Sequence, residues 1–418
     1  MNDLSLNKQT CVSRPRYLEF ALNYLDKPLI KVITGMRRSG KSVILKLIRQ
    51  ELLNRGIAPE RILYINFESQ ETAPFSTQQT LYQYIKDFAK EGRFYLLLDE
   101  VQYVENWERV LASCRVDFNC DIFITGSNAK LLSGELATLL SGRYINIPVY
   151  PLSFEEFLQF RNAFTGENAA ADRRAAFFDY LRFGGLPGIH EIAGSAGFEP
   201  DIIRPYLIDI FNSVLLKDVI SRKQIRDTEL LERIVRFVMD NIGHIVSAKS
   251  ISDFLKHQGR KHSTETVYNY LAALSEAYLL RKIGRYDIKG KRQLETLEKY
   301  YAEDAGIQNA VYGYHETDIS GLLENAVCLE LLRRGYAVSI GQLPQKEIDF
   351  IATKGGEKIY IQVAYLLADK AVIDREFSGL EEIQDNYPKL VLSMDPVWEY
   401  NREGIIRRNI IDWLLDSH

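Results

Sequence analysis

The sequence predicts an α/β protein whose first domain is built on a buried parallel sheet with a loop before its first helix. Three segments indicate this. The apolar run from Ile30 leads into GMRRSGKS and then into a stretch with apolar residues at three- and four-residue spacing. FYLLLDEVQ, from Phe94 to Gln102, and DIFITGSNA, from Asp121, are apolar runs that end in polar residues. Such runs are typical of buried parallel strands, whose carboxyl ends face the ligand.

Length and composition limit the classes of protein to consider. At about 100–200 residues per domain, a chain of 418 residues is expected to form two to four domains. A formal net charge of -4 argues against a protein that coats nucleic acid through bulk charge. We expect a cytoplasmic protein without a membrane segment, because no signal-peptide core and no run of about 18 apolar residues is present. The four cysteines lack CxxC spacing, which disfavours zinc sites and disulfides.

The loop after the first strand has the composition of a phosphate-binding loop (P-loop). Gly35, Gly40, Lys41 and Ser42 fit GxxxxGK[ST] between a strand and a helix, the context in which the pattern is meaningful. Glycines let backbone N–H groups approach phosphate, the helix N-terminus favours anions, and the lysine reaches the β and γ oxygens. We therefore predict that ATP binds to Gly35, Met36, Arg37, Arg38, Ser39, Gly40, Lys41, Ser42 and Asp99.

Polar residues at the ends of the next two apolar runs suit hydrolysis of the same nucleotide. Asp99 is expected to hold Mg²⁺ together with Ser42, and Glu100 is expected to polarise the attacking water. Asn128 is a candidate sensor of the γ-phosphate, although Ser and Asn before a helix also serve as N-caps. Arg143 is a candidate catalytic cation, acting in its own chain or in a neighbouring copy; a surface ion pair is the alternative.

Six motifs, in order, carry a resemblance to a known family. GMRRSGKS, YINFES, LLLDEVQ, ITGSNA, SGRY and PLSFEEF resemble the prokaryotic AAA-type ATPases that have a C-terminal domain of uncharacterised function. The resemblance covers nearly the whole chain. It implies a P-loop ATPase of the additional-strand, catalytic-glutamate class, with the strands of the sheet in the order 5-1-4-3-2. Lys41, Ser42, Asp99, Glu100 and Asn128 match the functional positions of that family.

The rest of the chain is expected to form three further segments. We predict a P-loop ATPase domain over residues 1–160, a helical lid or linker over 161–226, a winged helix over 227–292 and a nuclease-like domain over 293–418. Three helical patterns followed by LRKIGRYDIKGKRQ, which has the spacing of a hairpin, predict the winged helix.

Basic residues in this region suit phosphate contacts. They lie at positions 260–262 and 285–292, whereas the third helical pattern has no Arg or Lys before Arg281 to read guanine. We therefore expect that any binding of nucleic acid is weak and largely independent of sequence. The alternative is a winged helix that serves as a rigid protein-contact module, and self-association stays open.

The C-terminal region resembles a restriction-endonuclease-like core with degraded chemistry. Glu324 in a helix and Asp349 in a strand match two of its acids, and Glu347 points to the same face as Asp349. The acid-x-lysine pair expected in the next strand is replaced by Gln362 and Ala364. Loss of a carboxylate and a lysine favours a site without nuclease activity. A lysine from another element would restore the set, and the nearest in sequence are Lys346, Lys358 and Lys370.

These observations favour an ATP-hydrolysing switch whose nucleotide state controls the winged-helix and nuclease-like half and which acts on DNA or on another partner. Two alternatives remain at this stage. One is a metal-dependent nuclease gated by ATP, which the acids favour and the missing lysine opposes. The other is a nucleotide-dependent protein-interaction scaffold.

Overall fold

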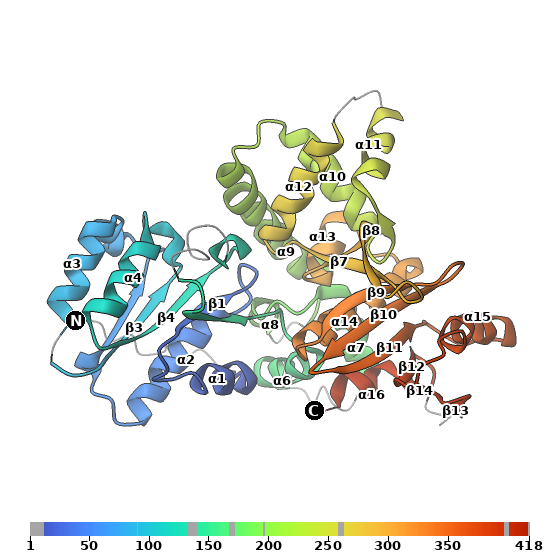
Figure 1. The fold of residues 1–418 in the computed structure, drawn as a ribbon, viewed down its shortest axis with the longest axis horizontal. Helices are drawn as coiled ribbons and strands as arrows, with labels where there is room; N and C mark the ends of the chain where they lie inside the picture. Colours follow the sequence, from blue (N-terminus) through green and yellow to red (C-terminus); the bar gives the residue numbers. More distant parts are fainter. Residues whose placement is uncertain are drawn as a thin grey trace. The chain divides into compact units, whose positions relative to one another are not determined.

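The structure, a computed structural model, describes residues 12–89, 91–132, 140–166, 172–194, 197–257, 263–396 and 401–416. It divides into two compact units. The first is Met1–Val149 with Glu276–Tyr278, and the second is Tyr150–Ser275 with Leu279–His418 (Figure 1). No helix in the described ranges is long and apolar enough to cross a membrane.

The first unit contains a five-stranded parallel sheet in the order β2-β3-β4-β1-β5. This is the predicted order 5-1-4-3-2, read from the other edge, and the prediction of a parallel sheet is confirmed. The elements are α1 (Pro15–Leu22), β1 (Ile30–Thr34), α2 (Lys41–Asn54), β2 (Ile62–Asn66), α3 (Gln78–Phe88), β3 (Phe94–Asp99), α4 (Trp107–Asp117), β4 (Cys120–Gly126) and β5 (Tyr144–Pro148).

Both faces of this sheet are buried, which explains the continuous apolar runs. Successive side chains of a strand point to opposite faces. Leu96 and Leu98 of β3 therefore enter one hydrophobic core, with Leu81 of α3, while Leu97 enters the other, with Ile44 of α2. Because every strand is parallel, the carboxyl ends of β1, β3 and β4 lie at one edge, and the polar residues that follow them meet there.

The second unit contains a nine-stranded mixed sheet in the order β13-β14-β12-β11-β10-β9-β7-β8-β6. Its strands are β6 (Ile245–Val246), β7 (Leu280–Asp287), β8 (Arg292–Ala302), β9 (Ala337–Gln342), β10 (Glu347–Lys354), β11 (Glu357–Val363), β12 (Lys389–Ser393), β13 (Asn401–Arg402) and β14 (Ile405–Asn409). Its helices are α6 (Phe154–Thr165), α7 (Arg173–Phe183), α8 (Gly188–Ala193), α9 (Pro200–Val214), the π-helical η7 (Leu215–Ser221), α10 (Thr228–Asp240), α11 (Ala248–His257), α12 (Thr264–Glu276), α13 (Ala305–Tyr312), α14 (Ile319–Arg333), α15 (Lys370–Glu381) and α16 (Ile410–Leu415).

The hairpin of β7 and β8 belongs to the same sheet as the C-terminal strands. β7 pairs antiparallel with β8 and parallel with β9, where Arg285 lies opposite Ile340. The predicted boundary between residues 292 and 293 falls at the start of β8, so one continuous strand contributes to both predicted segments. The division into four segments, the winged helix and the nuclease-like domain stay predictions.

The PLSFEEF motif is a helix start. The Ser153 hydroxyl accepts from the Glu156 N–H, and the Glu156 carboxylate accepts from the Ser153 N–H, which forms a capping box at the beginning of α6. The Arg333 guanidinium donates to the carbonyls of Pro151 and Leu152 at 3.2 and 3.4 Å. α14 thus fixes the segment that opens the second unit.

Candidate functional site

The loop between β1 and α2 depends on its glycines. Gly35 has φ +148°, and a Cβ there would lie 2.1 Å from the Val149 carbonyl oxygen. Gly40 is the N-cap of α2 in the left-handed region, with φ 99°, and supplies no side chain to cap the helix. The amino end of α2 therefore keeps its N–H groups and dipole directed at the loop, which favours an anion.

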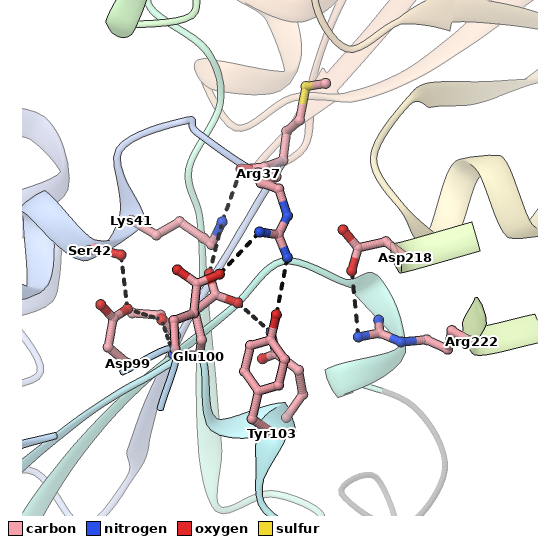
Figure 2. Close-up of polar contacts among 12 residues, drawn as sticks. Arg37, Lys41, Ser42, Asp99, Glu100, Tyr103, Asp218 and Arg222 are labelled. Carbon is pink, nitrogen blue, oxygen red and sulfur yellow. Dashed lines mark hydrogen bonds and ion pairs between the residues drawn. The ribbon is translucent and has the colours of Figure 1, made fainter. Parts of the chain in front are cut away.

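The other loop residues differ in their exposure and contacts. Met36 and Ser39 are buried, Arg38 is exposed in the left-handed region, and the Arg37 guanidinium donates to Glu68 at 3.1 Å and to the Tyr103 hydroxyl at 3.3 Å (Figure 2). Arg37 is therefore held by neighbours at the carboxyl edge of the sheet.

Lys41 is a buried cation in the middle of the site. Its ammonium donates to the Met36 carbonyl at 3.0 Å and lies 3.7 Å from Glu100 Oε1. A buried ammonium with a loop carbonyl as hydrogen-bond acceptor is well placed to exchange that carbonyl for a phosphate oxygen.

Asp99 lies at the carboxyl end of β3 and accepts three hydroxyl hydrogen bonds. The donors are Ser42 at 3.0 Å, Thr125 at 2.5 Å and Tyr64 at 3.1 Å (Figure 2). Burial raises the pKa of Asp99, and the hydrogen bonds from Thr125 and Ser42 oppose that shift. The structure thus brings the two predicted metal ligands, Ser42 and Asp99, into direct contact.

Sequence reasoning did not single out Tyr64 or Thr125. Both lie in quoted motifs, YINFES and ITGSNA, in strands that neighbour β3: Tyr64 is in the middle of β2, and Thr125 is the last residue but one of β4. For Thr125 the signal would have been the parallel register, because residues at the same edge of adjacent strands meet. Tyr64 pairs with Leu97 in the register, and its hydroxyl reaches Asp99 from there.

Two buried hydroxyl groups fit a polar ligand here. In the described residues, the hydroxyl oxygens of Ser39 and Ser127 are buried without a hydrogen-bond partner. Such atoms are uncommon in native proteins and call for an explanation. Ser39 lies in the loop and Ser127 directly follows β4 at the carboxyl edge of the sheet, so both unpartnered hydroxyls belong to segments that end at this edge.

Glu100 directly follows β3 in a strained conformation. It has φ 54° and ψ 50°, and its N–H donates to the Thr125 hydroxyl at 2.8 Å. The side-chain amide of Gln102 donates to its carboxylate. Strained backbone of this kind is concentrated at functional sites.

The structure places Asn128 at the predicted edge but not Arg143. Asn128 is buried, two residues after the end of β4. Arg143 is exposed and precedes β5, where its carbonyl accepts from the N–H of Ile30 at 2.9 Å. That is the amino edge of the sheet, opposite Asp99. This position does not favour action of Arg143 within its own chain, and its catalytic role stays a prediction.

The second unit contains a buried charge cluster that includes a displaced lysine. Lys299 of β8 places its ammonium 2.7 Å from Glu347, 3.3 Å from Glu324 and 4.0 Å from Asp349. Burial alone lowers the pKa of Lys299, but the three carboxylates reverse the shift and raise it. Burial raises the pKa of Glu324 and of Asp349. The lysine is none of the three nearest in sequence, one of which, Lys346, pairs with Glu382.

Gln362 takes part in this region without touching the Asp349 carboxylate. Its amide oxygen accepts from the Asp349 N–H at 3.4 Å, and its amide nitrogen donates to Glu376 at 3.1 Å. Asp349 itself accepts from the Val363 N–H at 2.8 Å. A polar residue in an apolar strand is thus explained by hydrogen bonds between neighbouring elements.

Part of the predicted basic surface is accessible. Lys289, Lys291 and Arg292 are exposed around the turn between β7 and β8. Arg285 is only 8% exposed, so its predicted contact with phosphate is wrong for this arrangement. Residues 260–262 lie outside the described residues.

Comparisons with known proteins agree with the first unit. Residues 27–158 match the family described as AAA domain, and residues 174–318 match a domain of unknown function (DUF8612). The Walker-type ATPase of Pyrococcus abyssi covers 72% of this chain and 95% of its own, with a TM-score of 0.51 and 15% identity, which shows the fold alone.

Two relatives match along most of their length. A protein of Haemophilus influenzae, described as uncharacterized, is 40% identical over 97% of this chain and 98% of its own. A protein of Methanocaldococcus jannaschii, also described as uncharacterized, is 32% identical over 92% of this chain and 85% of its own. With the AAA-domain match and the P-loop geometry, these similarities show that the chain belongs to the family of P-loop AAA-type ATPases that includes both relatives.

Proposed function

We propose that the protein hydrolyses ATP with Mg²⁺ at the carboxyl edge of the first sheet, and that its nucleotide state controls the second unit. The observation that carries the proposal is the hydrogen bond of 3.0 Å between Ser42 and Asp99, with Lys41 and Glu100 beside it. A loop that suits phosphate, two oxygen ligands that suit Mg²⁺ and an acid that suits water activation are assembled from two segments of the chain, Gly35 to Ser42 and Asp99 with Glu100.

Each residue has a defined task in the proposed reaction. Lys41 would transfer its hydrogen bond from the Met36 carbonyl to a β or γ oxygen. Ser42 and Asp99 would hold Mg²⁺, which would neutralise charge that develops on the phosphate oxygens. Glu100 would orient the attacking water and accept its proton, so its carboxylate must face the γ-phosphate.

The direct test measures ATP binding and phosphate release by the purified chain with Mg²⁺ and with excess EDTA. We expect binding and slow turnover with Mg²⁺ and loss of turnover with EDTA. A chain that binds no ATP at millimolar concentration would exclude the proposal.

Control of the second unit is tested by hydrogen exchange. If nucleotide state acts on it, amide protection in residues 150–418 should differ between ATP-bound Glu100→Gln protein and ADP-bound protein. Identical protection in the two states would leave the ATPase assignment intact and remove the switch.

A nuclease gated by ATP is the second candidate, and Lys299 is the observation that favours it. The displaced lysine restores a cation near Glu324, Glu347 and Asp349. However, its ammonium already pairs with all three acids, and so takes the role of neutralising their charge. A metal would have to compete with a covalently attached cation, which argues against cleavage.

We therefore expect no cleavage of DNA or RNA with Mg²⁺ or Mn²⁺, with or without ATP. Gel analysis of plasmid, linear duplex and single-stranded substrates checks this. Cutting that disappears in Asp349→Ala but persists in Lys41→Ala would establish the nuclease instead.

Any binding of nucleic acid through the hairpin turn should be weak and dependent on salt. Three accessible cations, Lys289, Lys291 and Arg292, are available for phosphates, so the logarithm of the affinity should fall with a slope of about 3 or less against the logarithm of salt concentration. Their reversal to Glu should remove binding in a fluorescence-anisotropy titration.

The matched control reverses three exposed lysines elsewhere in the second unit: Lys217, Lys249 and Lys370. It makes the same change in net charge away from the turn. Equal loss of binding in the two triple variants would indicate bulk charge rather than a site, and a preferred sequence that survives physiological salt would contradict the expectation.

A further inference from the structure

The acid proposed to activate water is held by a residue two positions further along the chain. Gln102 lies in the short 3-10 helix Val101–Tyr103, and its side-chain amide nitrogen donates to Glu100 Oε2. The other carboxylate oxygen, Oε1, lies 3.7 Å from the Lys41 ammonium. Both oxygens of Glu100 thus face donors from the protein.

The orientation of the Gln102 amide follows from its surroundings. A carboxylate accepts hydrogen bonds and cannot donate, so the amide nitrogen must face Glu100 and the amide oxygen must point away. That oxygen is buried, and no described residue donates to it. It packs against Gly126 at the end of β4, where an added Cβ would lie 2.7 Å from it. The orientation that forms the hydrogen bond to Glu100 therefore leaves the amide oxygen of Gln102 without a hydrogen-bond donor among the described residues.

The backbone of Glu100 is fixed independently of Gln102. Its N–H donates to the Thr125 hydroxyl at 2.8 Å, and the same hydroxyl donates to Asp99 at 2.5 Å. Loss of the Gln102 amide would consequently release the carboxylate without moving the backbone that carries it. A water-activating carboxylate needs an oxygen directed at the water, and Gln102 occupies one of the two.

We propose that Gln102 is a positioning residue that restrains the Glu100 carboxylate and thereby limits the rate of ATP hydrolysis. The inference rests on the proposed function of Glu100. Gln102 contacts neither the residues of the phosphate-binding loop nor the proposed metal ligands in the hydrogen bonds of the described residues. Its effect should therefore fall on kcat and not on the KM for ATP.

The test compares steady-state hydrolysis by Gln102→Leu and Gln102→Met with the unaltered chain. Both variants place an apolar side chain of similar size against Gly126 and lack the donor. A hydrogen bond to a charged group is worth roughly a factor of ten or more in an equilibrium, so we expect kcat to rise by about tenfold with KM unchanged. Glu105→Gln, an exposed acid in the same connection, is the matched control and should leave both constants unchanged.

A double variant separates the proposed role of Gln102 from the assignment of Glu100. Gln102→Leu should have no effect on turnover when Glu100 is already Gln, because the restrained group is gone. If Gln102→Leu and Gln102→Met both lower kcat or leave it unchanged, the proposed restraint of Glu100 by Gln102 is wrong. If Glu100→Gln still abolishes turnover in the same experiment, the ATPase assignment stands. Thermal unfolding of each variant checks folding, and the variant that folds decides the result.

Discussion

Replacing Glu100 by Gln should lower the rate of ATP hydrolysis by about 10²–10⁴-fold, the usual contribution of a general base, while ATP stays bound. The amide keeps the size of the carboxylate but cannot take a proton from water. Phosphate release and binding of a fluorescent ATP analogue, measured on the same preparation, separate the two effects. Glu105→Gln serves as the control for loss of one acid nearby.

Lys41→Ala should instead abolish both binding and turnover. The ammonium is buried, and it is the cation placed between the loop carbonyl of Met36 and Glu100. Its loss leaves the Glu100 carboxylate without its neighbouring positive charge and the phosphate without a cationic donor. Unchanged turnover in both Lys41→Ala and Glu100→Gln would remove the assignment of this site.

Lys299→Met should destabilise the second unit by about 3–5 kcal/mol, the cost of breaking a buried ion pair by removing one partner. Glu324, Glu347 and Asp349 would then face one another without the ammonium that contacts all three. Urea unfolding, followed by fluorescence, gives the change in free energy.

The pH dependence of the free energy of unfolding tests whether the unpaired carboxylates cause the loss of stability. Burial raises the folded-state pKa of Glu324 and Asp349, and loss of the lysine raises it further. A carboxyl whose pKa is raised on folding favours the folded state at low pH and loses that contribution as pH rises through the folded-state pKa. The deficit of Lys299→Met relative to the unaltered chain should therefore grow from pH 5 to pH 8.

Two further variants complete this experiment. Lys256→Met removes an exposed lysine that pairs with the exposed Asp253, and should cost less than about 1 kcal/mol. Adding Asp349→Asn to Lys299→Met should recover part of the loss, because one unpaired charge is removed with the lysine. A cost for Lys299→Met as small as that of Lys256→Met would show that the cluster does not depend on its lysine.

The fold of the first unit was predictable because its signals are local. The loop from Gly35 to Ser42 is contiguous in sequence, and its chemistry requires glycines, lysine and a hydroxyl at fixed spacing. Asp99 and Glu100 end an apolar strand, so their place at the ligand edge follows from the direction of parallel strands. The strand order came from the family resemblance, and the observed register agrees with it.

Contacts between distant segments were not predictable in the same way. Tyr64, Ser42 and Thr125 meet at Asp99 only because β2, β3 and β4 are in register and α2 starts beside them. The same register carries Arg143 to the opposite edge, although its sequence position after ITGSNA suggested the site. Strand order and register are set by pairings between residues far apart in sequence. These pairings decide which side chains meet, so the contacts cannot be predicted from local patterns.

The sequence by itself therefore determined the P-loop, the acidic strand end and the α/β class, since each depends on neighbours within a few residues. Only the tertiary structure decided which lysine meets the acids of the second unit. Lys299 lies in β8, which continues a hairpin into the same sheet as β10, and its ammonium reaches Glu347 and Glu324 across elements 48 and 25 residues away. The physical reason is that charge pairing in a buried cluster depends on distances in space, which the sheet sets and sequence separation does not.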